Sequence, residues 1–227
     1  MEYSHWAPVY ERIRADLGFS WERELASARR LAEWLPAGSA SEALARLRHR
    51  LADRDVVVVG LAPRAGAPPV WRLPPGDRPA GLVAADGAAA RCLDAALVPD
   101  VVVTDLDGPV PSEITAQSRG ALVVVHAHGD NRPALDRWLP EFRRDSTMGT
   151  WSGPPDPPLL DFGGFTDGDR AAYLAEAAGA RRVLLWGFDF GSVDDAEPDP
   201  VRKRRKLRWA QVALDHLAVR SAGRIHL

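Results

Sequence analysis

Apolar runs that end in an aspartate, usually beside a glycine, occur four times in this sequence. The five carboxylates at these run ends are Asp86, Asp105, Asp107, Asp130 and Asp189. In an open sheet of parallel strands, ligands bind in the crevice outside the carboxyl ends of the strands. If the strand order brings these ends together, the carboxylates converge, and cations must neutralise them because like charges raise one another's pKa. Such oxygen ligands suit Mg²⁺, which typically binds one or two carboxylates together with substrate phosphates.

Asp105 and Asp107 are the strongest metal-binding candidates. They stand two residues apart at the end of one apolar run, so both side chains point to the same side of an extended strand. A single aspartate after a strand usually caps the following helix, but only one residue of this pair can do so. The spacing therefore favours metal binding for Asp105 and Asp107.

A further acidic group, Thr166–Asp169, precedes an apolar helical pattern. Thr166 and Asp169 have the spacing of a capping box with aspartate in place of glutamate. That structural interpretation leaves Asp167 unexplained, at a helix N-terminus where a phosphate would also bind favourably. For Asp167 the structural and the functional interpretation are equally supported.

The dense basic run Arg202–Arg208 follows the Asp189 segment. In most proteins such a run is a solvated helix face, but beside an acidic crevice it could also bind a polyphosphate. In that second case Lys203 and Lys206 are the phosphate-binding candidates. Neither a P-loop motif nor a Gly-x-Gly-x-x-Gly dinucleotide motif occurs in the sequence, so neither of those nucleotide sites is predicted.

His126 and His128 stand two residues apart, with Asp130 beyond them. A zinc site would need a third nitrogen or sulfur ligand, and the sequence places none nearby. We therefore expect both histidines to hydrogen-bond in the crevice or to belong to the core. Asn131 directly follows Asp130 and is a candidate helix cap or substrate contact.

Two stretches rich in proline and glycine, Ala62–Arg78 and Gly149–Pro158, predict long loops near strand ends. Loops of this kind often serve as lids or binding loops. Trp151 has no apolar periodicity around it, which favours a lid role for its side chain. The acidic stretch Asp194–Pro200 is predicted to be mobile.

The elements that must position these residues alternate between strand and helix after residue 55. Strands are predicted at Val56–Val59, Gly81–Ala85, Val101–Val103, Leu122–Val125 and Val183–Trp186, with an edge strand at Arg224–Leu227. Helices are predicted at Ala88–Leu97, Ala134–Phe142, Ala171–Ala178 and Val201–Ala218. This alternation predicts an α/β fold with a mostly parallel sheet and right-handed crossovers. Residues 1–54 carry helical spacing and are expected to form an N-terminal helical segment packed on a core of residues 55–227.

The composition excludes several classes of protein. The chain has 227 residues, of which 46% are hydrophobic, and a net charge of −2, which is unlike a protein that coats nucleic acid. Its one cysteine, Cys92, cannot form an internal disulfide and is expected to be a buried, inert thiol. The sequence has no apolar run of about 18 residues and no signal-peptide core. These features predict a cytoplasmic protein with neither a membrane nor a nucleic acid as its partner, and they leave homo-oligomerisation open.

Four blocks of the sequence resemble one known family. In the order of that family they are Pro99–Gly108, Val124–Asn131, Gly163–Ala171 and Leu184–Phe190. Together they resemble the archaeal-type 6-hydroxymethyl-7,8-dihydropterin diphosphokinases over nearly the whole chain. The core is also similar to the catalytic domain of thiamin diphosphokinases, which implies a Rossmann-like three-layer fold. We expect no room in this chain for the second, β-rich domain of the thiamin enzymes.

The resemblance implies an activity and a set of site residues. The implied reaction is Mg²⁺-dependent transfer of diphosphate from ATP to the hydroxymethyl group of the dihydropterin, with release of AMP, in folate or tetrahydromethanopterin biosynthesis. By the same match Asp105 and Asp107 bind the metal. The further active-site carboxylates are Asp86, Asp130, Asp167 and Asp189. The candidate ATP- or substrate-binding residues are Asn131, Thr166, Lys203, Lys206 and Trp151.

The pterin ring would need an aromatic wall and a few polar groups. Trp151, Phe165 and Phe188 are the aromatic candidates, although each phenylalanine alone is more simply a core residue. Asn131 or Asp189 could bind the polar edge of the ring. Three alternatives remain at this stage: a diphosphokinase for another small alcohol such as thiamin, a glycosyltransferase-like domain that binds a nucleotide sugar, and a non-catalytic nucleotide-binding module.

Overall fold

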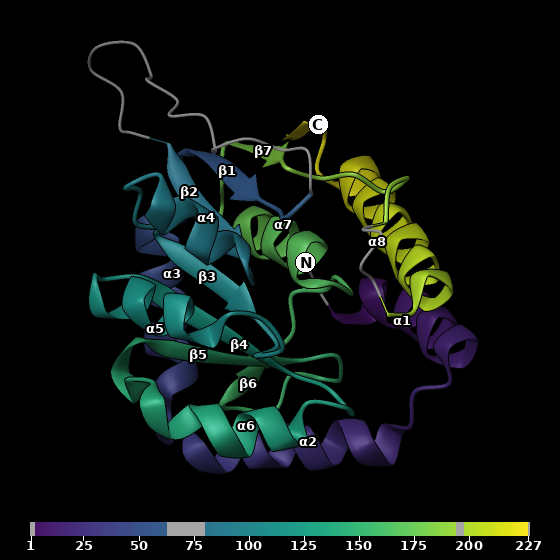
Figure 1. The fold of residues 1–227 in the computed structure, drawn as a ribbon, viewed down its shortest axis with the longest axis horizontal. Helices are drawn as coiled ribbons and strands as arrows, with labels where there is room; N and C mark the ends of the chain where they lie inside the picture. The colour runs from purple at the N-terminus through teal and green to yellow at the C-terminus, as the bar shows by residue number, and fades with distance from the viewer. Residues whose placement is uncertain (1–2, 63–79, 194–197, 227) are drawn as a thin grey trace.

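An eight-stranded parallel sheet forms the centre of the molecule (Figure 1). The computed structural model describes residues 3–62, 80–193 and 198–226. The strands are β1 (Asp55–Val59), β2 (Gly81–Ala85), β3 (Val101–Thr104), β4 (Leu122–Ala127), β5 (Thr147–Trp151), β6 (Leu159–Leu160), β7 (Arg182–Trp186) and β8 (Ile225–His226). Their order is β6-β5-β4-β3-β2-β1-β7-β8, and every neighbouring pair is parallel. The chain thus adds β2 to β6 on one side of β1 and then returns to place β7 on the other side.

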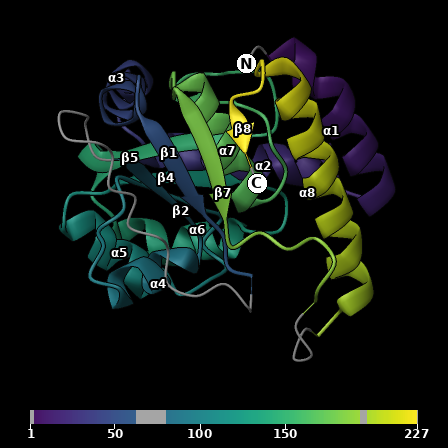
Figure 2. The same cartoon turned by 90° about the horizontal axis from the view of Figure 1, so that it is seen from above.

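Helices cover both faces of this sheet, which makes three layers (Figure 2). They are α1 (Tyr3–Leu17), α2 (Trp21–Trp34), α3 (Ser39–Leu51), α4 (Ala88–Asp94), α5 (Val110–Ser118), α6 (Arg132–Trp138), α7 (Asp167–Ala177) and α8 (Pro200–Arg220). Helices α1, α3, α7 and α8 share a core with Val56 and Val58 of β1. Helices α2, α4, α5 and α6 share the opposite core with Val57 and Val59. The predicted α/β three-layer fold is confirmed.

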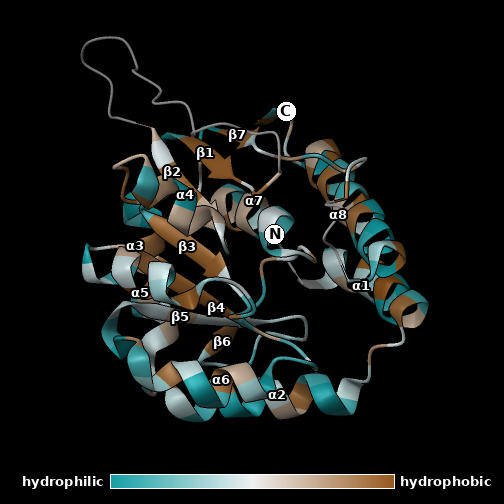
Figure 3. Cartoon of the chain, in the orientation of Figure 1, coloured by the Kyte–Doolittle hydropathy of each residue, from teal (hydrophilic) through white to brown (hydrophobic). Residues whose placement is uncertain are grey.

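The central strands are buried on both faces, which explains why they are continuous apolar runs and not alternating ones. All five residues of β1 and all six of β4 are buried. Figure 3 shows these strands as mostly apolar, whereas α8 alternates between apolar and polar residues. A helix with one apolar stripe needs burial on one side only.

Most of the predicted elements are present with boundaries shifted by a few residues, but three were missed. The predicted loop over Gly149–Pro158 is wrong at its start, because Thr147–Trp151 forms β5 between β4 and β6. A Cβ on Gly149 would lie 2.4 Å from Leu35 Cδ1 and 2.6 Å from Leu159 Cδ2. Gly149 therefore marks a close approach inside the sheet and not a turn. Helix α5 and the two-residue strand β6 were also missed.

Two other loop predictions concern residues that lie largely outside the described part of the chain. Of Ala62–Arg78 only Ala62 is described, and of Asp194–Pro200 only the last three residues.

Cys92 is fully buried on α4, as expected, and burial raises the pKa of its thiol to about 11. None of the helices in the described ranges has the length and apolar character needed to cross a membrane.

Asp55→Asn is expected to lower the free energy of unfolding by about 2 kcal/mol at pH 7. Asp55 is 2% exposed, at the opposite end of β1 from the strand-end aspartates. It accepts hydrogen bonds from Arg182 Nε (3.0 Å) and Arg181 Nε (2.9 Å). Hydrogen bonds from Arg182 and Arg181 hold the pKa of Asp55 well below its usual range. Both arginines are about half exposed, so solvent screening limits the effect.

The pH dependence of this effect follows from the lowered pKa of Asp55. A carboxyl with a lowered folded-state pKa stabilises the protein above its unfolded pKa of about 4, and this stabilisation is lost as the pH falls further. The difference between wild type and Asp55→Asn should therefore shrink below about pH 4. Urea unfolding of both proteins from pH 7 to pH 3 measures this difference in the free energy of unfolding. A difference that stays constant over that range contradicts the ion-pair explanation.

Candidate active site

The carboxyl ends of β2, β3 and β4 open into a cavity of about 200 Å³, which we call the acidic cavity. Its aspartates are Asp86, Asp105, Asp107, Asp130 and Asp167. Parallel strands end at the same edge of a sheet, and adjacent β2, β3 and β4 deliver the first four of these residues. Asp167 begins α7, which crosses β1, β2 and β3 on one face. The rest of the lining comes from α1, α2, α8 and the α1–α2 connection, and includes Tyr10, Phe19, Glu24, Lys203 and Lys206.

A second cavity of about 350 Å³ adjoins the acidic cavity where β1, β2 and β7 end. The two cavities share Asp86, Thr166, Asp167, Lys203 and Leu207. Its own lining is more apolar and includes Leu61, Phe188 and Phe190. It lies between β1 and β7, where the direction of strand addition reverses, which is the usual place for ligands in open α/β sheets.

Asp189 lines this second cavity and not the acidic one. Its Oδ1 accepts hydrogen bonds from the backbone N–H groups of Gly191 (2.9 Å) and Ser192 (3.1 Å). Of the five expected strand-end carboxylates, four therefore meet in the acidic cavity. Asp189 lines the second cavity instead, together with Asp86 and Asp167.

His128 holds the side chain of Asp105. Asp130 N–H donates to His128 Nδ1 (3.3 Å), which leaves Nε2 as the donor to Asp105 Oδ2 (3.2 Å) when the ring is neutral. Burial alone would raise the pKa of Asp105, but the hydrogen bond and charge of His128 lower it below the usual range. Asp105 is therefore ionised at neutral pH.

The pKa of Asp107 is shifted in the opposite direction, above its usual value. Burial, and then the charge of Asp105, raises the pKa of Asp107, while the charge of Lys206 opposes this rise. Burial and the charge of Asp105 likewise raise the pKa values of Asp86 and Asp167. Burial and mutual repulsion thus both make these carboxyl groups hold their protons more tightly. When all of them are ionised, the site carries an excess of negative charge.

Glu113 on α5 lies behind this group and was missed by the sequence analysis. It is fully buried, and neither of its carboxyl oxygens has a hydrogen-bond partner among the described residues. Burial, together with the charge of Asp86, raises the pKa of Glu113 to about 9. The carboxyl is therefore protonated at neutral pH. The signal for it was an acidic residue in the buried stripe of α5, with Val110 and Ala116.

The start of α7 is capped as predicted. Thr166 and Asp169 form a capping box, in which Asp169 Oδ1 accepts from Thr166 N–H (2.8 Å). Asp167 is left over, and its Oδ1 faces Arg170 Nη1 at 3.4 Å. Arg170 is itself buried and lines the acidic cavity. The sequence analysis missed it because nothing in its local pattern distinguishes it from a surface arginine.

Asn131 and Trp151 do not have the surroundings expected of substrate contacts. Asn131 Nδ2 donates to the backbone oxygens of Asp105 (2.9 Å) and His126 (2.7 Å), and its Oδ1 accepts from His128 N–H (3.0 Å). Its amide thus ties the loops after β3 and β4 together. Trp151 is 8% exposed at the end of β5, where Nε1 donates to Pro154 O (3.0 Å). It lines neither cavity, so the lid prediction is corrected: the side chain is part of the core.

His126 belongs to the core, whereas Phe165 and Phe188 each line a cavity. His126 is buried beside Thr150 and Ser152, with its ring nitrogens 3.1 and 3.3 Å from their hydroxyl oxygens. Phe165 is nearly buried but reaches the acidic cavity, and Phe188 lines the second one. Both phenylalanines thus serve the core and face a cavity.

The basic run of α8 faces the acidic cavity with part of its length. Lys203 and Lys206 line that cavity, and Lys203 also lines the second one. Arg202 Nη2 lies 3.5 Å from Asp130 Oδ2, and Arg23 of α2 lies 3.4 Å from Asp130 Oδ1. Asp130 therefore pairs with two arginines at the rim, unlike the deeper aspartates.

The acidic cavity suits a hard divalent cation by its donor set. Within the described ranges, no three His, Cys, Asp or Glu side chains are arranged as a ready-made metal site. Asp105 and Asp107 nevertheless supply carboxylate oxygens amid an excess of negative charge. Mg²⁺ commonly takes one or two carboxylates and completes its shell with water and substrate phosphates, so the residues present fit that ion.

Gly108→Ala is expected to displace the Asp86 carboxylate without unfolding the protein. A Cβ at Gly108 would lie 2.3 and 2.4 Å from the two carboxylate oxygens of Asp86, so the side chain must turn away. Misplacing one group in a site can lower kcat about tenfold or more. Steady-state assays with a thermal melt test this expectation, and wild-type kcat with an unchanged melting temperature contradicts the role of Asp86.

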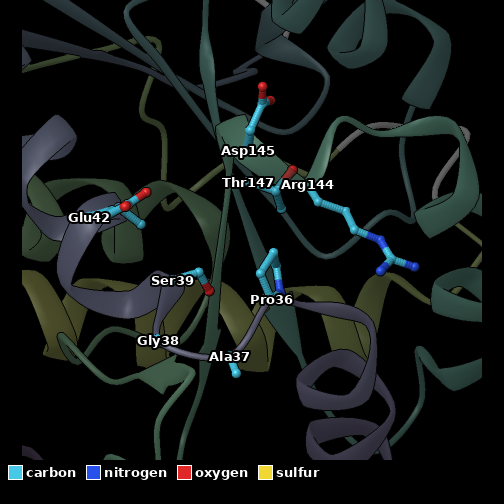
Figure 4. Close-up of a pocket in the computed structure, with 9 residues that line it drawn as sticks. Pro36, Ala37, Gly38, Ser39, Glu42, Arg144, Asp145 and Thr147 are labelled. Atoms are coloured by element: carbon cyan, nitrogen blue, oxygen red, sulfur yellow. The ribbon is translucent and has the colours of Figure 1, made fainter.

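Another cavity of about 350 Å³ lies at the amino end of β5 (Figure 4). It is lined by the α2–α3 connection and by Arg144, Asp145 and Thr147. It contains none of the strand-end aspartates and no lysine, so it lacks the chemistry of the acidic cavity.

Comparisons with known proteins agree with the sequence-based resemblance. The sequence profile of the 6-hydroxymethylpterin diphosphokinase MptE-like family matches residues 42–195. Three relatives carry the name 6-hydroxymethyl-7,8-dihydropterin pyrophosphokinase. The protein from Methanothermobacter thermautotrophicus is 39% identical over 96% of this chain and 95% of its own length. The protein from Pyrococcus furiosus is 37% identical over 96% and 94%, and that from Methanocaldococcus jannaschii is 28% identical over 96% of each. The chain therefore belongs to the 6-hydroxymethylpterin diphosphokinase MptE-like family.

Proposed function

We propose that this protein transfers diphosphate from ATP to 6-hydroxymethyl-7,8-dihydropterin and releases AMP, with Mg²⁺ as the metal. The observation that carries the proposal is the acidic cavity, in which Asp105 and Asp107 face Lys203 and Lys206. The names of the relatives supply the acceptor. The place of the product in folate or tetrahydromethanopterin biosynthesis, and a cytoplasmic location, belong to the same proposal.

The proposed reaction requires positioning and charge neutralisation more than covalent chemistry. The hydroxymethyl oxygen of the pterin bonds to the β-phosphorus of ATP, the bond from that phosphorus to the α–β bridging oxygen breaks, and AMP leaves. A carboxylate of the acidic cavity accepts the hydroxyl proton. Mg²⁺ bound by Asp105 and Asp107 would neutralise charge on the phosphates.

The residues of α8 and α7 have matching roles in this proposal. Lys203 and Lys206 bind phosphate oxygens from the side of the cavity opposite the strands. Arg170 balances the buried charge of Asp167, at 3.4 Å, and keeps the start of α7 in place. His128 and Asn131 position Asp105 through its side chain and its backbone oxygen.

An AMP-release assay tests this function. Purified protein is incubated with ATP, with and without Mg²⁺, and with the dihydropterin, thiamin or no acceptor. We expect AMP and the pterin diphosphate only when the pterin and Mg²⁺ are both present. AMP formation with thiamin but not with the pterin would assign a different acceptor to the same fold, and no AMP with either would refute the diphosphokinase proposal.

A further inference from the structure

Glu24 is a buried carboxyl group of the acidic cavity that has no role in the reaction described above. It lies in the first turn of α2, a helix that packs against α6 and over β4 and β5 (Figure 1). The residue is 2% exposed, and its Oε2 has no hydrogen-bond partner within the described part of the chain. A buried acceptor without a donor is unusual in a native protein and calls for an explanation.

The surroundings of Glu24 differ from those of the aspartates. Its neighbours in the lining of the cavity include the aromatic rings of Tyr10, Phe19 and Phe165. Phe19 and Phe165 lie with ring centroids 6.2 Å apart. Burial raises the pKa of Glu24, whereas the Gly129 backbone N–H and the charge of His128 oppose this rise. The lining of the cavity thus contains a carboxyl group beside aromatic rings, in addition to the aspartates and lysines.

We propose that Glu24 binds the polar edge of the acceptor ring, by accepting hydrogen bonds from the 2-amino group and the adjacent ring N–H. This assignment rests on the proposed function. Those two groups are donors that lie side by side, and a carboxylate can accept from both at once. Adenine offers a donor beside an acceptor, and phosphate groups would be repelled, so neither the base nor the phosphates of ATP match Glu24 in this way; the ribose hydroxyls are tested through the KM for ATP.

The shape of the ring allows one molecule to contact both Glu24 and the groups that bind the diphosphate. In a 6-hydroxymethylpterin the 2-amino group and the hydroxymethyl group lie at opposite ends of a flat bicyclic ring. Binding of the amino end at Glu24 therefore directs the hydroxymethyl end away from α2. Asp105, Asp107 and Lys206 line the same cavity, so a ring bound at Glu24 has the groups that bind the diphosphate within the same space.

Glu24→Gln tests the assignment, with Glu22→Gln as the matched control. Glu22 is exposed one position before Arg23 in the same helix turn. We expect Glu24→Gln to raise the KM for the dihydropterin about 10- to 100-fold while the KM for ATP changes little. Glu22→Gln should match the wild type in both constants. An unchanged pterin KM, or a raised requirement for Mg²⁺ in its place, overturns the proposal.

A substrate analogue tests the same contact in the wild-type protein and so does not depend on how the variant folds. The analogue carries a carbonyl oxygen in place of the 2-amino group, which replaces one donor by an acceptor facing Glu24. We expect wild type to use it with a kcat/KM about 10- to 100-fold lower than that of the pterin, and Glu24→Gln to lose this preference.

The outcomes separate the two proposals. If wild type releases no AMP with the pterin, the proposed function fails. If it does so but uses the pterin and the analogue equally well, only the assignment of Glu24 fails.

Discussion

Asp105→Asn and Asp107→Asn are each expected to lower kcat/KM about 10³-fold while the protein remains folded. Each substitution removes one carboxylate charge from the pair that faces the lysines across the acidic cavity. A factor of 10³ corresponds to about 4 kcal/mol of transition-state stabilisation, which is the scale of removing one major electrostatic contact. Steady-state assays over a range of Mg²⁺ concentrations measure this loss.

The two variants should differ in stability, which provides an internal check. Burial and the charge of Asp105 raise the pKa of Asp107. A carboxyl with a raised folded-state pKa destabilises the protein once the pH exceeds its unfolded pKa, and most strongly above the folded one. Asp107→Asn should therefore raise the melting temperature at pH 8. The pKa of Asp105 is lowered through His128, so Asp105→Asn should not.

Asp94→Asn is the matched control for this pair, because Asp94 is an exposed aspartate of α4. It should leave both the activity and the melting temperature unchanged. Wild-type turnover of both site variants at low Mg²⁺ would refute the metal-binding role. A higher melting temperature for Asp105→Asn but not for Asp107→Asn would refute the electrostatic description of the pair.

Lys206→Ala is expected to lower kcat/KM for ATP about 10²-fold, with a change in stability of within about 0.5 kcal/mol. Lys206 is half-buried and lines the acidic cavity, and its charge opposes the rise in the pKa of Asp107. Its ammonium group is therefore close enough to the aspartates to bind the phosphates that they and the metal would bind.

The control for Lys206 comes from the same helix. Arg204 is an exposed residue of α8 that lines neither cavity, so Arg204→Ala should behave as wild type. The measurements are the ATP concentration dependence of AMP release and thermal unfolding. If Lys206→Ala instead melts early and retains the wild-type KM for ATP, the basic run is only a solvated helix face.

The positions of the aspartates that follow β2 and β3 could be predicted because they depend on local sequence patterns. Continuous β-branched runs such as Val56–Val59 form buried parallel strands, and all such strands end at one edge of the sheet. Asp86, Asp105 and Asp107 follow their strands directly, so the edge at which they lie was determined before the strand order was known. The capping box of Thr166 and Asp169 is equally local.

The errors concern residues whose role depends on distant packing. Gly149 looked like a turn residue, but it lies in β5, where glycine is required because Leu35 and Leu159 leave no room for a Cβ. Trp151 was predicted to be a lid residue for lack of periodicity around it, yet its ring packs against Trp21 of α2 at 6.2 Å between centroids. In both cases one deciding neighbour, Leu35 or Trp21, lies more than a hundred residues away, in or directly after α2.

The sequence by itself therefore determined the fold class, the edge of the sheet that carries the chemistry and the family, because each rests on local periodicity or on ordered blocks of residues. Only the tertiary structure decided which side chains share one cavity. It placed Glu24 in the same cavity as the aspartates, buried Glu113 behind Asp86 and moved Asp189 to the neighbouring cavity. The physical reason is that burial and pKa depend on every group packed around a carboxyl, and for these residues those groups come from helices far apart in the chain.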